Sequence, residues 1–70
     1  MNSEYKYLNK YERMIIVFLN SYGEASTLQI AKMLNIHWTT TKKNLKSLED
    51  KEVVKKIVMG NRVLWKLSLS

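Results

Sequence analysis

Two short helices joined by a tight turn are predicted by the stretch STLQIAKMLNIHWTTTKKNLKSLEDKE, residues 26–52. The first helix begins at Ser26, because Ser26 and Gln29, three residues later, form the pattern of a capping box. Apolar residues then recur at helical spacing, namely Leu28, Ile30, Ala31 and Leu34. Asn35 tolerates the left-handed conformation that ends helices, so we expect a helix of about nine residues followed by a tight turn.

The second helix of this stretch is predicted to run from His37 or Trp38 to about Lys51. Its core-facing side, at positions i, i+4 and i+7, consists of Thr41, Leu45 and Leu48. Its opposite side and the flanks of that side are mostly polar and basic, and they carry Thr39, Thr40, Lys42, Lys43, Lys46, Ser47 and Asp50. This pattern predicts an amphipathic helix whose basic side stays in solvent.

The charges along this helix run against its dipole. The bases lie toward the N-terminal end of the exposed side, whereas Glu49 and Asp50 gather at the C-terminal end. A helix dipole favours the opposite order, with acids first and bases last. The arrangement indicates that positive charge is placed here for a partner, at some expense of stability.

A further helix is predicted upstream, from Asn9 to about Tyr22. Asn9 and Glu12 form a second capping-box pattern, and Gly23 is a suitable left-handed stop. We interpret the helix as mostly buried, because it is apolar around most of its circumference, at Tyr11, Met14, Ile15, Ile16, Val17, Phe18, Leu19 and Tyr22. We expect a core stripe of Tyr5, Leu8, Tyr11 or Glu12, Ile15 and Tyr22. Residues 1–8 either prolong the helix or form a short arm.

The C-terminal segments predict a β-hairpin. Val53–Met59 and Arg62–Leu69 are rich in strand formers, and Gly60-Asn61 between them is a two-residue turn signal of type II′. In the register that this turn sets, Lys55 lies opposite Lys66, a like-charge pair that a phosphate would relieve. One side of the hairpin carries Val54, Val58, Val63, Trp65 and Leu67, of which Trp65 is expected in the core.

Length and composition predict a single domain, residues 1–70, without evident chemistry of its own. The chain has no cysteine and one histidine, which excludes a disulfide framework, a thiolate zinc site and a cysteine nucleophile. It carries no Gly-rich phosphate loop and no H-E-x-x-H motif, so we expect neither an enzyme nor a bound cofactor or metal. Because there is no signal-peptide pattern and the longest apolar run is Met14–Leu19, we expect no membrane association and a cytoplasmic, nucleoid-associated location.

The formal net charge of +6 is distributed unevenly along the chain. Residues 1–31 carry as many acids as bases, so the whole excess lies in residues 32–70. A one-sided basic field indicates a polyanionic partner, either nucleic acid or an anionic membrane surface. A membrane-surface helix fits less well, because the apolar stripe of residues 37–51 is narrow and lacks a phenylalanine anchor.

Taken in order, these elements resemble the winged helix-turn-helix DNA-binding family over roughly residues 11–67. The motifs that carry the resemblance are Ser26–Ala31, Leu34-Asn35-Ile36, Thr41, Leu45, Leu48-Glu49, Val53-Val54 and Trp65-Lys66-Leu67. The chain is most similar to the minimal MarR- and ArsR-like regulators of bacteria, archaea and viruses. The resemblance implies an α+β fold of three helices followed by a two-stranded wing. The family usually has glycine at Asn35 and Glu52, and Glu52 leaves open a one-residue shift of the turn before the wing.

The resemblance also implies a sequence-specific transcriptional regulator that binds double-stranded DNA. The helix over about residues 38–51 would enter the major groove, and the wing tip, about residues 59–62, would reach the adjacent minor groove or the backbone. The candidate contacts are His37, Trp38, Thr39, Thr40, Lys42, Lys43, Lys46, Lys55, Asn61, Arg62 and Lys66. His37 either caps the helix or meets a phosphate, and Trp38 either packs over the helix seam or touches DNA or a second subunit. We expect a homodimer through the N-terminal helix, and no small-molecule effector is evident.

Other functions stay open. The chain could coat DNA without sequence preference, as a nucleoid or replication protein, or act as a winged-helix protein-interaction module. The wing ending Val63–Leu67 is similar to that of Z-DNA-binding winged helices, but these carry Asn and Tyr where Lys42 and Lys46 stand, and prolines before the Trp. The sequence therefore argues against Z-DNA. The composition, rich in Lys, Ile and Tyr, suits an archaeal virus or plasmid.

Overall fold

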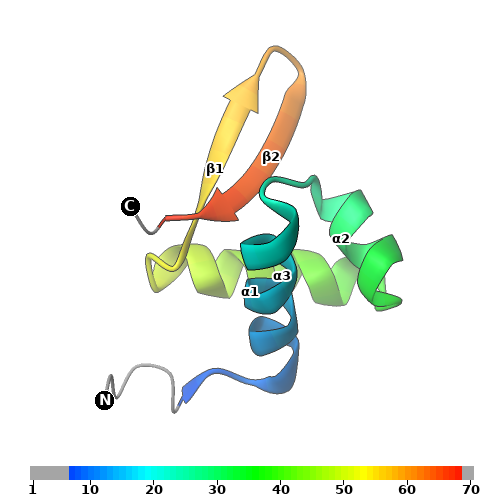
Figure 1. The fold of residues 1–70 in the computed structure, drawn as a ribbon, viewed down its shortest axis with the longest axis vertical. Helices are drawn as coiled ribbons and strands as arrows, with labels where there is room; N and C mark the ends of the chain where they lie inside the picture. Colours follow the sequence, from blue (N-terminus) through cyan, green and yellow to red (C-terminus); the bar gives the residue numbers. More distant parts are fainter. Residues whose placement is uncertain (1–6, 69–70) are drawn as a thin grey trace.

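Three helices precede an antiparallel hairpin in the computed structural model, which describes residues 7–68 (Figure 1). The elements are α1 (Lys10–Tyr22), α2 (Thr27–Leu34), α3 (Trp38–Asp50), β1 (Val54–Met59) and β2 (Arg62–Leu67). This order confirms the predicted α+β architecture of three helices followed by a two-stranded wing. The predictions for residues 1–6 and for Leu69 lie outside the described residues.

Both predicted capping boxes form, and they fix where α1 and α2 begin. At α1 the Asn9 side chain accepts the Glu12 N–H, and the Glu12 carboxylate accepts the Asn9 N–H, both at 2.8 Å. At α2, Ser26 and Gln29 make the same reciprocal pair at 3.1 and 3.0 Å. Each box satisfies backbone donors that a helix start otherwise leaves without partners.

The helix ends are less uniform than predicted. Asn35 ends α2 in the left-handed conformation, with φ 56° and ψ 47°, as predicted. The predicted left-handed stop at Gly23 is wrong, because Gly23 has a positive φ of 103° but a ψ of −90°. After α3, Glu52 itself adopts a left-handed φ of 62°, and the N–H groups of Glu52 and Val53 bond to the carbonyls of Glu49 and Leu48. The turn before the wing is therefore not shifted.

One small core lies where the helices meet the base of the hairpin, and its largest enclosed apolar side chains are Ile15, Leu19, Ile30, Leu45, Leu48 and Val54. Trp65 closes the core as predicted, since it is only 7% exposed and its Nε1 donates to Thr27 Oγ1 at 3.0 Å. Ala25 and Trp65 exchange two backbone hydrogen bonds, of 3.1 and 2.8 Å. These contacts tie the base of the wing to the segment before α2.

The interpretation of α1 as mostly buried is wrong. Ile15 and Leu19 are buried, but Val17 is 65% exposed and Tyr22, expected in the core stripe, is 54% exposed. Tyr11 is also exposed. Of the two residues expected at that place in the core stripe, Tyr11 or Glu12, Glu12 is therefore the buried one. The reason is that α3, α2 and β2 pack on one side of α1, which leaves an apolar opposite side in solvent.

The hairpin has the predicted register, including Lys55 opposite Lys66 and Met59 opposite Arg62. Gly60 has a φ of 64° whereas Asn61 is not among the residues with positive φ, which fits the predicted type II′ turn. The wing projects beyond the helices (Figure 1), so its apolar side is buried only at the base. Val58 and Val63, farther out, are exposed.

Candidate nucleic-acid interface

The exposed side of α3 presents the candidate polar and cationic residues in one row. Thr39, Lys42, Lys43 and Lys46 are all exposed, whereas Thr41, Leu45 and Leu48 on the opposite side are fully buried, as predicted. The helix is thus anchored by its apolar side, which leaves the basic side free for a ligand.

His37 caps α3. Its Nδ1 accepts the Thr39 N–H at 3.2 Å and lies 2.7 Å from Thr39 Oγ1. The His37 side chain is exposed, and its Nδ1 is engaged with the first turn of the helix through Thr39. Of the two predicted roles, the structure shows the capping role.

Trp38, the first residue of α3, is 44% exposed and so does not belong to the core. The Nζ of Lys42 lies 4.9 Å from the centroid of its ring, within range of a cation–π interaction. An indole face and an ammonium group are therefore held together at the N-terminal end of α3.

Lys46 forms ion pairs with two acidic residues of the same helix. Its Nζ lies 3.3 Å from Asp50 and 3.6 Å from Glu49, the acids that sit against the helix dipole. The hydrogen bond and the charge of Asp50, together with the charge of Glu49, raise the pKa of the Lys46 ammonium above its ordinary value. The net positive field of α3 is accordingly concentrated in its N-terminal half, at Lys42 and Lys43.

A buried polar network holds α3 against α1, and the sequence prediction missed it. The Glu12 carboxylate is 1% exposed and accepts hydrogen bonds from Ser47 Oγ at 2.7 Å and Lys51 Nζ at 2.8 Å. Asn44, also buried, accepts from Asn9 Nδ2 at 2.8 Å and donates to the Thr40 carbonyl at 2.7 Å. Burial raises the pKa of Glu12, but the hydrogen bonds from Lys51, the Asn9 N–H and Ser47 outweigh it and lower the pKa overall. These bonds join the first turn of α1 to the side of α3 that faces it.

Lys10 borders the exposed basic side of α3, and the sequence prediction missed this as well. It belongs to the electrically neutral first half of the chain, yet it lies beside Lys43 in a shallow groove of about 510 Å³ between α1 and α3. The same groove is lined by Thr40, which is half-buried. Only the crossing of the two helices reveals this neighbourhood, because Lys10 and Lys43 are far apart in sequence.

The wing carries the remaining candidate residues. Lys55 and Lys66 face each other across the two strands near the base, while Asn61 and Arg62 are exposed at the tip. The structure thus places the candidates in two groups, one on α3 and one along the wing. Within residues 7–68, no group of three or more His, Cys, Asp or Glu side chains is placed to hold a metal ion. No helix in that range is long and apolar enough to cross a bilayer.

Residues 8–55 match the family model of winged helix-turn-helix DNA-binding domains. No curated protein matches the chain. Among solved structures, the Zα domain of zebrafish PKZ, without ligand, is 31% identical over 87% of this chain and 95% of its own length, with a TM-score of 0.84. The Zα domain of Carassius auratus PKZ, in complex with Z-DNA, is 29% identical over 83% of this chain and 92% of its own, with a TM-score of 0.77.

Two bacterial proteins have the same fold. Lactococcus lactis ZitR, solved as a cysteine-to-serine mutant in complex with DNA, is 28% identical over 86% of this chain, with a TM-score of 0.78, and this chain covers 42% of it. Mycobacterium bovis Mb0332, a possible ArsR-family regulator whose fragment 1–100 is homodimeric, is 24% identical over 87% of this chain and 56% of that one, with a TM-score of 0.79. The second likeness shows the fold alone.

Proposed function

The chain belongs to the winged helix-turn-helix DNA-binding family, and on this premise we propose that it is a transcriptional regulator that recognises a specific duplex sequence. The observation that supports this most is the exposed basic row on α3, anchored from behind by a fully buried apolar side. The proposed role is binding alone, without catalysis.

In this proposal the N-terminal half of α3 enters the major groove. Lys42 and Lys43 bind phosphates or the O6 and N7 atoms of guanine, and Thr39 contacts a phosphate or a thymine methyl group. Arg62 at the wing tip reaches into an adjacent narrow minor groove, where the potential is most negative. Lys46 contributes less to DNA binding, because its ammonium group already forms ion pairs with Asp50 and Glu49.

The remaining candidate contacts have supporting roles. The paired Lys55 and Lys66 straddle one phosphate, which removes their mutual repulsion. His37 holds the first turn of α3 in place through its bond with Thr39. Its Nε2 contacts a phosphate of the DNA backbone. Trp38, Thr40 and Asn61 border the two groups of cations.

The test is a selection of bound duplexes from a genomic library, followed by titrations of the selected site and of random DNA at several salt concentrations. We expect the selected site to bind more tightly than random DNA, and log K to fall with log [salt] by about 0.9 per phosphate neutralised. Lys43→Ala should weaken binding, while the matched control Lys32→Ala, an exposed lysine on α2, should not. Equal affinity for random DNA would indicate a coating protein, and the absence of DNA binding even at low salt would indicate a protein-interaction module.

A second candidate, binding of left-handed Z-DNA, is favoured by the likeness to Zα domains over nearly their whole length. Two residues argue against Z-DNA binding, because Lys42 and Lys46 stand where the Z-DNA-binding motif has Asn and Tyr. Circular dichroism of an alternating CG duplex separates the two candidates. Inversion of the spectrum on addition of the protein would support Z-DNA binding, and an unchanged right-handed spectrum of bound duplex would support the regulator.

We also propose that the chain acts as a homodimer through its N-terminal helix, in the cytoplasm at the nucleoid, or in the host cytoplasm if it is viral. The exposed apolar side of α1 supports the dimer. Two copies related by a twofold axis would read two half-sites in inverted orientation. Sedimentation of the protein with and without the selected duplex measures both stoichiometries.

A further inference from the structure

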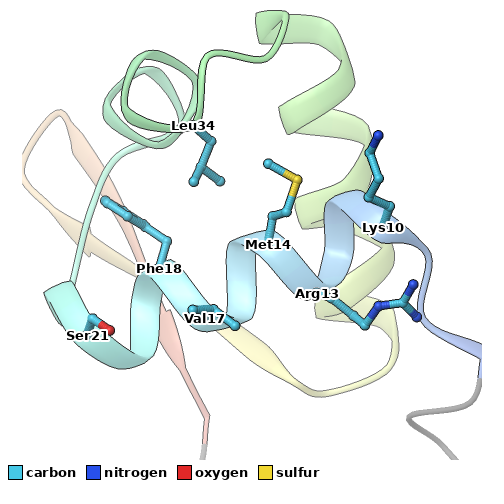
Figure 2. A pocket seen from close by; sticks show the side chains of 7 residues that line it. All are labelled: Lys10, Arg13, Met14, Val17, Phe18, Ser21 and Leu34. Atoms are coloured by element: carbon cyan, nitrogen blue, oxygen red, sulfur yellow. The ribbon is translucent and has the colours of Figure 1, made fainter.

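Two of the three lysines on the exposed side of α3 have charged neighbours. Lys46 forms ion pairs with Asp50 and Glu49, which screen its charge. Lys43 lies beside another cation, Lys10, in the groove between α1 and α3. Figure 2 shows the Lys10 side chain extending from the first turn of α1 toward α3. Two ammonium groups in one groove repel each other and gain most from a shared anion, such as a backbone phosphate.

Lys42 has a different neighbour, the indole ring of Trp38 one helical turn earlier. The Lys42 Nζ lies 4.9 Å from the centroid of that ring, and residues four positions apart share one side of a helix. Tryptophan is the aromatic residue that attracts cations most strongly. Trp38 is 44% exposed, so more than half of its surface is covered by the protein and the ring still has room for the ammonium group.

A cation–π contact holds an ammonium group without cancelling its charge. A carboxylate also holds the group, as at Lys46, but leaves less positive charge for DNA. A lysine that is free in solvent loses rotamer freedom when a ligand fixes it, whereas Lys42 has lost part of that freedom before DNA binds. An ammonium group has three N–H donors, so those directed away from the ring remain for a ligand. Lys42 is therefore a charged donor that is already held in position.

We propose that Trp38 positions Lys42 to read a guanine in the major groove. Lys42 lies in the N-terminal half of α3, the part of a recognition helix that contacts base edges. Guanine presents O6 and N7 there, two adjacent acceptors that one lysine can bind together from a fixed point. A phosphate carries no sequence information and accepts from many directions, so it does not require a donor held in place.

This inference rests on the proposed function and decides between the two ligands given there for the lysines of α3. Lys42 takes the base, and Lys43, beside Lys10, takes the phosphate. Trp38 acts through Lys42 and is a positioning residue, so the indole itself does not contact DNA.

Variants of both residues test the proposal on the selected duplex. Lys42→Ala should relax the preference for guanine at one position by about five- to a hundredfold, which identifies that guanine. Trp38→Leu keeps an apolar side chain but removes the aromatic face, and it should relax the same position about three- to tenfold while binding random duplex as wild type does. Trp38→Phe restores a ring and should recover most of the preference.

The measured quantity is a ratio of affinities in fluorescence anisotropy titrations. One duplex carries the identified guanine, and the other carries 7-deazaguanine in its place, which lacks the N7 acceptor. Lys43→Ala is the matched control, because loss of a phosphate contact should lower both affinities by the same factor. Combining Trp38→Leu with Lys42→Ala should lose no more of the preference than Lys42→Ala does, since Trp38 acts only through Lys42.

A purely structural role of Trp38 would lower the midpoint of thermal unfolding and weaken binding of both duplexes equally. Equal weakening by Trp38→Leu would therefore overturn the proposal, as would a preference that Trp38→Phe does not recover. If the protein selects a site but Lys42→Ala leaves every position unchanged, this inference fails and the proposed function stands. If no duplex is preferred over random DNA, both fail.

Discussion

Removing the charge of Glu12 should destabilise the domain far more than removing that of a surface glutamate tested beside it. One carboxylate oxygen accepts the Asn9 N–H at 2.8 Å, and the other accepts Ser47 Oγ at 2.7 Å and Lys51 Nζ at 2.8 Å. Glu12→Gln has the same size but only one accepting atom. Whichever way the amide is turned, its NH₂ group faces a donor, so at least one buried bond becomes a donor–donor contact.

The expected cost follows from the bonds lost. Hydrogen bonds to a charged group contribute about 1.5–3 kcal/mol each, so Glu12→Gln should lower the free energy of unfolding by about 2–3 kcal/mol. A domain of this size has about 4–10 kcal/mol in total, and the midpoint of thermal unfolding should fall by about 10–20 °C. Glu49→Gln is the matched control, because its ion pair with Lys46 is 3.6 Å long and lies at the surface. There the loss should stay below about 0.5 kcal/mol.

Urea unfolding of both variants, followed by far-ultraviolet circular dichroism, measures the difference. A Glu12→Gln loss no larger than that of Glu49→Gln would refute the reasoning. The pH dependence gives a second check, since the pKa of Glu12 is lowered in the folded chain from an ordinary value of 4.5. A lowered pKa stabilises the fold above that value and the stabilisation is lost as the pH falls through the folded pKa. The gap between wild type and Glu12→Gln should therefore narrow below about pH 4.5.

Three more predictions concern other parts of the fold. Glu52→Gly should raise the free energy of unfolding by about 1 kcal/mol in urea, because Glu52 holds a left-handed φ of 62° that glycine adopts without strain; no gain would contradict this. Asp50→Asn should free the charge of Lys46 and tighten duplex binding about three- to tenfold at low salt in a fluorescence anisotropy titration, an effect that must shrink as salt is added. Thr27→Val removes the acceptor of the Trp65 Nε1–H and should cost about 1 kcal/mol in thermal unfolding, so an unchanged midpoint would show that the bond is dispensable.

Most features set by neighbouring residues could be predicted from the sequence, although the left-handed stop expected at Gly23 does not form. The capping boxes at Asn9 and Ser26, the left-handed Asn35 and the two-residue turn at Gly60 each depend on a few consecutive residues, and all of them form. The hairpin register follows from the turn, so the pairing of the two strands is local in the same sense.

Features set by distant residues could not be predicted. Glu12 reads as a capping residue, and nothing near it in sequence shows that Lys51 will lie against it. In the same way, α1 is apolar on two sides, and only the packing of α3 and β2 decides which side becomes core. The α3 row was predictable because its apolar and basic sides are distinct, whereas the place of Lys10 beside Lys43 depends on how two helices cross.

Three side-chain bonds between residues far apart in the sequence have a consequence for folding kinetics. The side-chain bonds from Asn9 to Asn44, from Glu12 to Lys51 and from Trp65 to Thr27 join residues 35, 39 and 38 positions apart. Each closes a loop of about half the chain. The conformational entropy of that loop must be lost before the bond can form and stabilise the fold. Folding should therefore be slower than in a simple helical bundle of equal length, with a single exponential phase. A peptide of residues 26–52 alone, without these closures, should remain largely unstructured.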